Sequence, residues 1–143
     1  MKILDANVLI GWHRNDHPHH HAVKQWCDHL LATDEPFGAA DLAWVAFLRV
    51  ATNPKAFKTP SPLVDVFAFR SAVEQRPTCV PIASGPRHWQ IMERVGIKHR
   101  ASANLVNDAY LAAIAIEHGA ELVSIDGDFG RFHELRWIDP LAL

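Results

Sequence analysis

The sequence has little cysteine, no long apolar run and no excess of charge of either sign. Only two of its 143 residues are cysteine, and Cys27 and Cys79 lie far apart. This excludes a disulfide scaffold and a cysteine-based zinc site, and it favours a reducing compartment, the cytoplasm. No apolar stretch approaches the roughly 18 residues of a membrane span. We therefore expect no membrane segment, and the first apolar run, interrupted by Asp5, is not expected to be a signal peptide.

Charge and composition exclude several further classes of protein. The 14 basic and 16 acidic residues give a net charge of -2, which gives no support for binding a polyanion by overall charge. A polyanionic substrate would need a local basic rim or a metal ion. The chain contains no glycine-rich nucleotide-binding motif, which disfavours dinucleotide and P-loop enzymes. A hydrophobic content of 49% excludes a disordered chain, and the length suits one domain.

Strands alternate with helices along the chain. We predict strands at 2–5, 37–39, 78–82, 121–125 and 136–138, and helices at 6–15, 18–32, 41–52, 59–76, 86–95 and 104–118. This alternation predicts a three-layer α/β/α domain with a mainly parallel central sheet. Gly96 and Gly119 are expected to end the last two helices. In such sheets, ligands bind beyond the carboxyl ends of the strands.

Carboxylates follow two of these strands at that edge. Asp5 ends the first strand and Asp126 ends the fourth, with Asp128 two residues further on. Asp108 lies on the last helix, at the flank of its apolar stripe. Carboxylates that converge would repel one another unless a hard cation lay between them, and Mg²⁺ and Mn²⁺ prefer such oxygen ligands. These residues therefore predict a Mg²⁺- or Mn²⁺-dependent phosphodiester hydrolase.

Each carboxylate also has a purely structural alternative. Asp5 could cap the helix that follows it, Asp126 and Asp128 could form only a turn, and Asp108 could be held in an ion pair. A haloacid-dehalogenase-like phosphatase would also place an aspartate after its first strand. That chemistry needs an acid two residues later, where this chain has Asn7.

Three segments resemble the acidic motifs of PIN domains. They are ILDANVL at 3–9, NLVNDAYLAA at 104–113 and AIEHGAELVSIDGDF at 115–129. The whole chain is most similar to the VapC toxins, the ribonuclease half of VapBC toxin–antitoxin modules. The resemblance implies one PIN domain over 1–143 and a metal-dependent endoribonuclease that cleaves structured RNA, either tRNA or rRNA. It also implies a VapB-type antitoxin as partner and a homodimer.

The resemblance implies a role for six polar residues. Three of them would bind the metal and carry catalysis, namely Asp5, Asp108 and Asp126. Three others would assist. They are Asn7, which would orient Asp5 or a metal-bound water, the hydroxyl of Ser124, and the nearby carboxylate of Asp128.

One position departs from the family pattern. VapC proteins usually have a glutamate on the third helix, where this chain has Ala46. Asp41 lies five residues earlier, about 500° of helix rotation away, so it cannot replace that glutamate on the same face. We expect activity to survive, because Mg²⁺ needs few protein ligands. The alternative is a catalytically weakened PIN domain that acts as an RNA- or antitoxin-binding module.

Basic residues are scattered along the chain. They could be ordinary surface charge or a rim that holds RNA phosphates around the acidic site. For the rim, the predicted RNA-binding residues are Arg49, Lys98 and Arg100.

Histidines and aromatic residues allow two further hypotheses. Five histidines at 13–21 could bind zinc, but their irregular spacing favours a solvated helix start. A groove lined by Trp12, Trp44, Phe47 and Leu48 could receive the C-terminal segment of an antitoxin.

Overall fold

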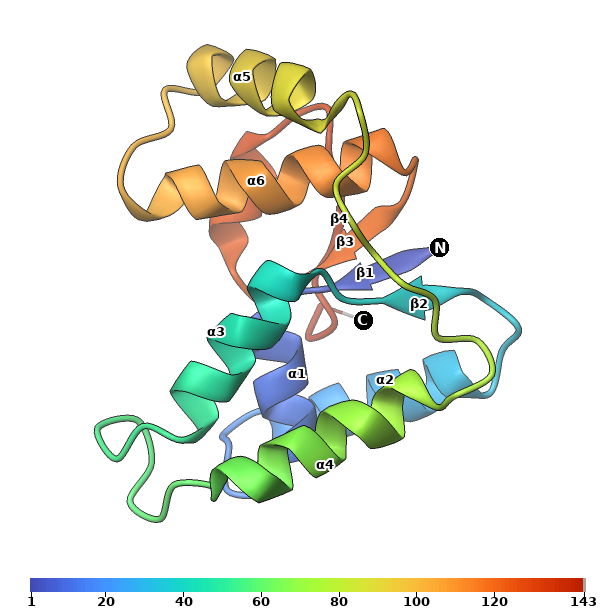
Figure 1. Cartoon of the computed structure of the whole chain (residues 1–143), viewed down its shortest axis with the longest axis vertical. Coiled ribbons are helices and arrows are strands. Elements are labelled where there is room, and N and C mark those ends of the chain that lie inside the picture. Colours follow the sequence, from blue (N-terminus) through green and yellow to red (C-terminus); the bar gives the residue numbers. More distant parts are fainter. Residues whose placement is uncertain (143) are drawn as a thin grey trace.

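Four short parallel strands form the centre of the computed structural model, which describes residues 1–142 (Figure 1). In sheet order, the strands are β2 (Phe37–Gly38), β1 (Lys2–Leu4), β3 (Glu121–Val123) and β4 (Arg136–Ile138). The register pairs Ile3 with Leu122 and Leu4 with Val123. Because all the pairs are parallel, the carboxyl ends of β1 and β3 meet at the same edge, as predicted.

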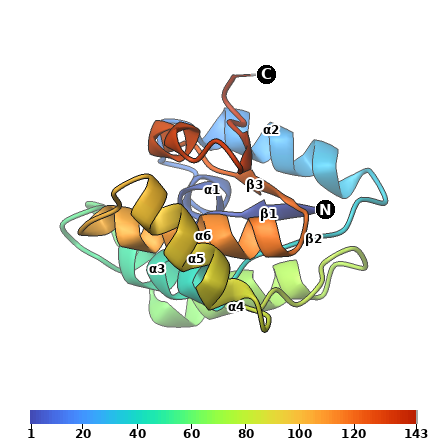
Figure 2. The same ribbon diagram turned by 90° about the horizontal axis from the view of Figure 1, so that it is seen from above.

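Six α-helices cover this sheet. They are α1 (Ala6–His13), α2 (His20–Leu31), α3 (Asp41–Ala51), α4 (Leu63–Glu74), α5 (His88–Lys98) and α6 (Asn104–Glu117). Seen from above, α2 lies on one side of the sheet, whereas α5 and α6 lie together on the other (Figure 2). The predicted three-layer α/β/α architecture is confirmed. A 3₁₀-helix, η1 (Gly127–Arg131), follows β3 and was not predicted. No helix in the described part of the chain is long and apolar enough to cross a membrane.

Apolar residues of the middle strands and of α6 form the core. Ile3, Leu4, Leu122 and Val123 are each at most 1% exposed, so these strands are buried on both faces. This burial is typical of a parallel sheet between two helical layers. It also fixes the position of the polar residues that follow each strand.

The predicted strand at 78–82 is replaced by two isolated bridges. Cys79 pairs with Phe37, and Ile82 pairs with Ala40. Pro81 lies between them and has no N–H group to donate to a continuous ladder. The chain therefore runs beside β2 without forming a fifth strand.

The helix ends differ in how well the sequence indicated them. Gly119 has a φ of 62° and ends α6 as predicted. The prediction for Gly96 was wrong, because α5 continues through it to Lys98. Arg100 takes the left-handed position instead, with a φ of 53°, and the Ala101 N–H donates to the Gly96 carbonyl at 2.9 Å. This bond gives the Gly96 carbonyl, near the end of α5, a hydrogen-bond donor, although the left-handed residue is an arginine and not a glycine.

The aromatic groove suggested by the sequence is filled by α4. Phe47 is fully buried, and Trp44 is 4% exposed. The ring of Phe69, from α4, lies 5.4 Å from the rings of both Trp12 and Phe47. These side chains therefore belong to the packing between α1, α3 and α4, and that hypothesis about an antitoxin groove is wrong.

Candidate active site

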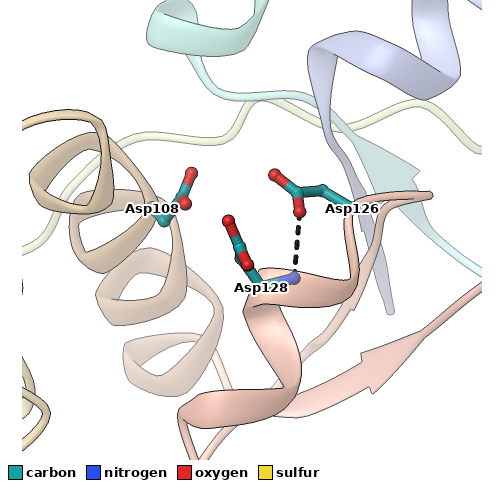
Figure 3. Close-up of side chains that lie close together, drawn as sticks. All are labelled: Asp108, Asp126 and Asp128. Carbon is teal, nitrogen blue, oxygen red and sulfur yellow. Dashed lines mark hydrogen bonds between the residues drawn. The ribbon is translucent and has the colours of Figure 1, made fainter.

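Three carboxylates gather beyond the carboxyl end of β3 (Figure 3). Asp108 points from α6 toward Asp126, which follows β3, and toward Asp128 in η1. One carboxylate oxygen from each residue lies within 4.8 Å of the other two. Such an arrangement offers several oxygen ligands to one hard divalent cation.

The turn after β3 brings Asp128 into this group. Asp126 is the N-cap of η1, and its Oδ1 accepts the backbone N–H of Asp128 at 2.9 Å. This bond folds the chain so that both carboxylates face Asp108. The structural role of Asp126 as a cap and its predicted role as a ligand are therefore compatible, because its second oxygen remains available.

Asp5 lies beside this group in a network of hydrogen bonds. It is 9% exposed and caps α1, with Oδ1 accepting the Ala6 N–H at 2.7 Å. Its Oδ2 accepts the Ser124 hydroxyl at 2.8 Å and the Asn7 amide at 3.2 Å. Three hydrogen bonds therefore hold the Asp5 carboxylate in position. The group of three carboxylates within 4.8 Å of one another contains Asp128 and does not contain Asp5.

Asn7 and Ser124 connect the two strand ends. The Asn7 side chain donates to the Ser124 hydroxyl at 2.9 Å and accepts the Ile125 N–H at 3.1 Å. Ser124 is fully buried, and its Oγ also accepts the Asp126 N–H at 3.1 Å. Through these bonds Asn7 and Ser124 fix the positions of the neighbouring aspartates. The roles that the resemblance implies for the two residues stay predictions.

Burial and mutual repulsion raise the pKa of two of these carboxyls. Burial raises the pKa of Asp5, and the charge of Asp126 raises it further, while the Ser124 hydroxyl and the Ala6 N–H oppose the shift. Burial raises the pKa of Asp108 to about 6, with further contributions from the charges of Asp126, Asp5 and Asp128. Burial is the larger cause of both shifts, and repulsion between the neighbouring carboxylates adds to it.

This group of carboxylates fits a divalent cation. The donors are carboxylate oxygens only, which suits Mg²⁺ or Mn²⁺ and not a metal that prefers sulfur or imidazole. Arg131 is the one basic residue that lowers the pKa of Asp108, and its guanidinium lies 4.0 Å from an oxygen of Asp128. A cation bound between the three carboxylates would remove most of the remaining repulsion.

Other candidate ligands lie elsewhere in the described residues. Asp41 is exposed at the start of α3 and lines a separate pocket with Arg70 and Glu74. Ala46 lies on α3 and offers no ligand atom. No three histidines of the stretch at 13–21 come together as metal ligands, and His20 instead contacts the Gly11 carbonyl at 2.8 Å.

The predicted RNA-binding residues lie at two helix ends. Arg49 is exposed on the last turn of α3, whereas Lys98 and Arg100 are exposed at the end of α5. Sequence reasoning missed Arg131, which contacts Asp128, and Glu134, which forms ion pairs with Arg94 and Lys98 of α5. Arg131 lies three residues after Asp128, and residues at this spacing are neighbours in a 3₁₀ turn. This spacing is the one feature of the sequence that could have indicated the contact between the two side chains.

The fold and the acidic group together define a class of protein. A family model for the PIN domain matches residues 2–135. Ribonuclease VapC31 of Mycobacterium tuberculosis is 47% identical over 140 residues, which cover 98% of this chain and 99% of the relative. Ribonuclease VapC25 of the same species is 46% identical over the same shares. The chain therefore belongs to the PIN domain family. Within it, the chain is one of the VapC ribonucleases, as the sequence motifs indicated.

Solved structures give the same fold at much lower sequence identity. VapBC2 from Rickettsia felis, bound to a DNA fragment from its promoter, matches with a TM-score of 0.68 at 15% identity and covers 96% of each chain. VapC20 of Mycobacterium tuberculosis, described as a toxin that cleaves the sarcin–ricin loop, matches with a TM-score of 0.64 at 14% identity. It covers 95% of this chain and 99% of its own.

Proposed function

We propose that this ribonuclease is the toxin of a toxin–antitoxin pair, and that it cleaves structured RNA with the help of Mg²⁺ or Mn²⁺. The observation that carries the metal dependence is the convergence of Asp108, Asp126 and Asp128 within 4.8 Å. Among the ion pairs of residues 1–142, Arg131, 4.0 Å from Asp128, is the one cation that contacts this group. Asp108, Asp126 and Asp128 would hold the ion. Asp5 would complete the site from the end of β1, where Ser124 and Asn7 orient its carboxylate.

The chemistry of this site is displacement at phosphorus. A bound divalent ion would activate water and neutralise the charge that develops on the phosphate oxygens. The protein contributes a fixed geometry, because Ser124, directly after β3, forms hydrogen bonds both with Asp5 at the end of β1 and with Asp126. Such preorganised ligands need little rearrangement when charge develops in the transition state.

Structured RNA and a VapB-type antitoxin are the partners that we propose. Loops of structured RNA expose unpaired bases that a small protein can grip, and the similar VapC20 is described as cleaving such a loop. The similar VapBC2 was solved as a toxin–antitoxin complex, which supports an antitoxin partner for this chain. We also propose a homodimer, on the resemblance to VapC proteins alone.

Metal binding should stabilise the protein. At a metal concentration of about 100 times the dissociation constant, binding to the folded state alone adds ~2.7 kcal/mol to the free energy of unfolding. We expect Mg²⁺ and Mn²⁺ at millimolar concentration to raise the melting temperature and to give a saturable heat of binding in isothermal titration. Absence of binding to both ions at millimolar concentration would overturn the proposed metal site, and with it the expectation that the site functions without a glutamate at position 46.

Cleavage of total bacterial RNA by the purified, antitoxin-free protein tests the proposed activity. We expect discrete fragments in the presence of Mg²⁺ or Mn²⁺, no cleavage with EDTA, and no cleavage by the Asp5→Asn variant. The fragment ends would identify the RNA target. Retention of intact RNA by a folded protein, without cleavage under any of these conditions, would favour the alternative of a binding module and make Ala46 the first residue to change.

A further inference from the structure

A cluster of charged side chains lies next to the acidic site and is not part of it. Segments 94–100 and 131–135 contain four basic residues and one acidic residue, Glu134. The Glu134 carboxylate lies 2.7 Å from the Arg94 guanidinium and 3.9 Å from the Lys98 ammonium. Arg94 and Lys98 are four residues apart on α5, so they project from the same face of the helix.

Packing places this cluster beside the three carboxylates. Gly96, between the two cations, packs toward Ala109, the neighbour of Asp108 on α6. From the other side, the ring of His99 lies 5.5 Å from Phe132, which follows Arg131 directly. The Arg131 guanidinium lies 4.0 Å from the Asp128 carboxylate. Arg131 therefore joins the acidic group to the segment that packs against His99.

We propose that Arg94, Lys98 and Glu134 form a subsite for a backbone phosphate of RNA, in which the Glu134 carboxylate occupies the phosphate position until RNA displaces it. This inference rests on the proposed action on RNA and adds how the substrate is held. Carboxylate and phosphate oxygens bind the same guanidinium and ammonium groups. Glu134 thus competes with the substrate and lowers its affinity.

The geometry suits displacement. The Arg94 and Lys98 side chains are 56% and 58% exposed, and an ion pair so exposed to water is weak. The Lys98 contact of 3.9 Å is longer than a hydrogen bond, so this cation is incompletely paired. Glu134 follows Arg131 by three residues, so the two cations that it contacts lie near the path of a strand that leaves the acidic group past Arg131.

The matched control is an ion pair on α2. Lys24 and Asp28 lie 2.5 Å apart, four residues apart on one helix, with side chains 52% and 53% exposed. Asp28→Asn changes the net charge of the protein by the same amount as Glu134→Gln, and Lys24→Gln matches Lys98→Gln in the same way. A difference in RNA affinity between the variants near the acidic site and the matched variants on α2 therefore reflects the position of the charge and not the total charge of the protein.

The experiment measures RNA affinity without cleavage. A fluorescein-labelled RNA hairpin is titrated with the wild type and each variant in EDTA, by fluorescence anisotropy at several salt concentrations. We expect Glu134→Gln to tighten binding about fivefold and Arg94→Gln and Lys98→Gln each to weaken it about fivefold, with the salt slope reduced by about 0.7 per lost contact. Asp28→Asn and Lys24→Gln should leave the affinity unchanged.

Two outcomes separate this inference from the proposed activity. If Glu134→Gln binds no more tightly than Asp28→Asn, or if the loss of Lys98 has no effect, the phosphate subsite is overturned whether or not the wild type cleaves RNA. If the affinities follow the expected pattern but the wild type cleaves nothing with metal, the subsite is supported and the proposed nuclease activity is not.

Discussion

Asp108→Asn is expected to lower the rate of metal-dependent RNA cleavage roughly a thousandfold. The substitution removes one of three carboxylates that converge within 4.8 Å. A metal ion contributes several kcal/mol to the stability of such a transition state, and each ~1.4 kcal/mol corresponds to a tenfold change in rate. The measurement is single-turnover cleavage of the RNA identified in the total-RNA assay. Asp34→Asn, an exposed aspartate in the loop before β2, is the control and should cleave at the wild-type rate.

The same variant should be more stable than the wild type when no metal is present. The pKa of Asp108 is raised to about 6, so the folded state holds this proton more tightly than the unfolded chain does. The proton on Asp108 therefore adds to the free energy of unfolding below pH ~4, and this addition is lost as the pH rises through about 6. We expect Asp108→Asn to raise the melting temperature at pH 7 in EDTA and to remove this part of the pH dependence. A lower melting temperature at pH 7 would contradict a site with uncompensated negative charge.

Ser124→Ala should destabilise the fold by about 2–3 kcal/mol at pH 7. Ser124 is fully buried and donates to Asp5 at 2.8 Å. Its Oγ also accepts from the Asn7 amide and from the Asp126 N–H. Removal of the hydroxyl leaves an almost buried carboxylate without one of its donors, and two N–H groups without an acceptor. Urea denaturation, with the exposed Ser84→Ala as control, measures the loss.

The pH dependence of this loss distinguishes the hydrogen bond from simple packing. The Ser124 hydroxyl lowers the pKa of Asp5, so the pKa should rise further in Ser124→Ala. A raised pKa in the folded state costs stability where the unfolded chain has already lost its proton. The loss should therefore be larger at pH 7 than at pH 4. An equal loss at both pH values would mean that the hydroxyl only fills space.

The order of strands and helices could be predicted from the sequence, because burial leaves a local pattern. Continuous apolar residues indicated β1 and β3, and turn residues marked most of the helix boundaries. The end of α5 could not be predicted from Gly96, because packing against α6 allows a glycine inside the helix and the left-handed conformation fell on Arg100. Pro81 likewise outweighed the apolar character of the segment at 78–82.

The sequence by itself determined that Asp5 and Asp126 would share one edge of the sheet. The carboxyl ends of adjacent parallel strands lie at the same edge of the sheet, so the aspartates that follow β1 and β3 must lie there too. The pairing of Leu4 with Val123 confirms this. The tertiary structure alone decided which carboxylates face one another. The turn at η1 brings Asp128 toward Asp108, whereas the buried hydroxyl of Ser124 holds Asp5 beside them. Those contacts join residues more than a hundred positions apart or depend on the path of one short turn, and neither leaves a periodic signal in the sequence.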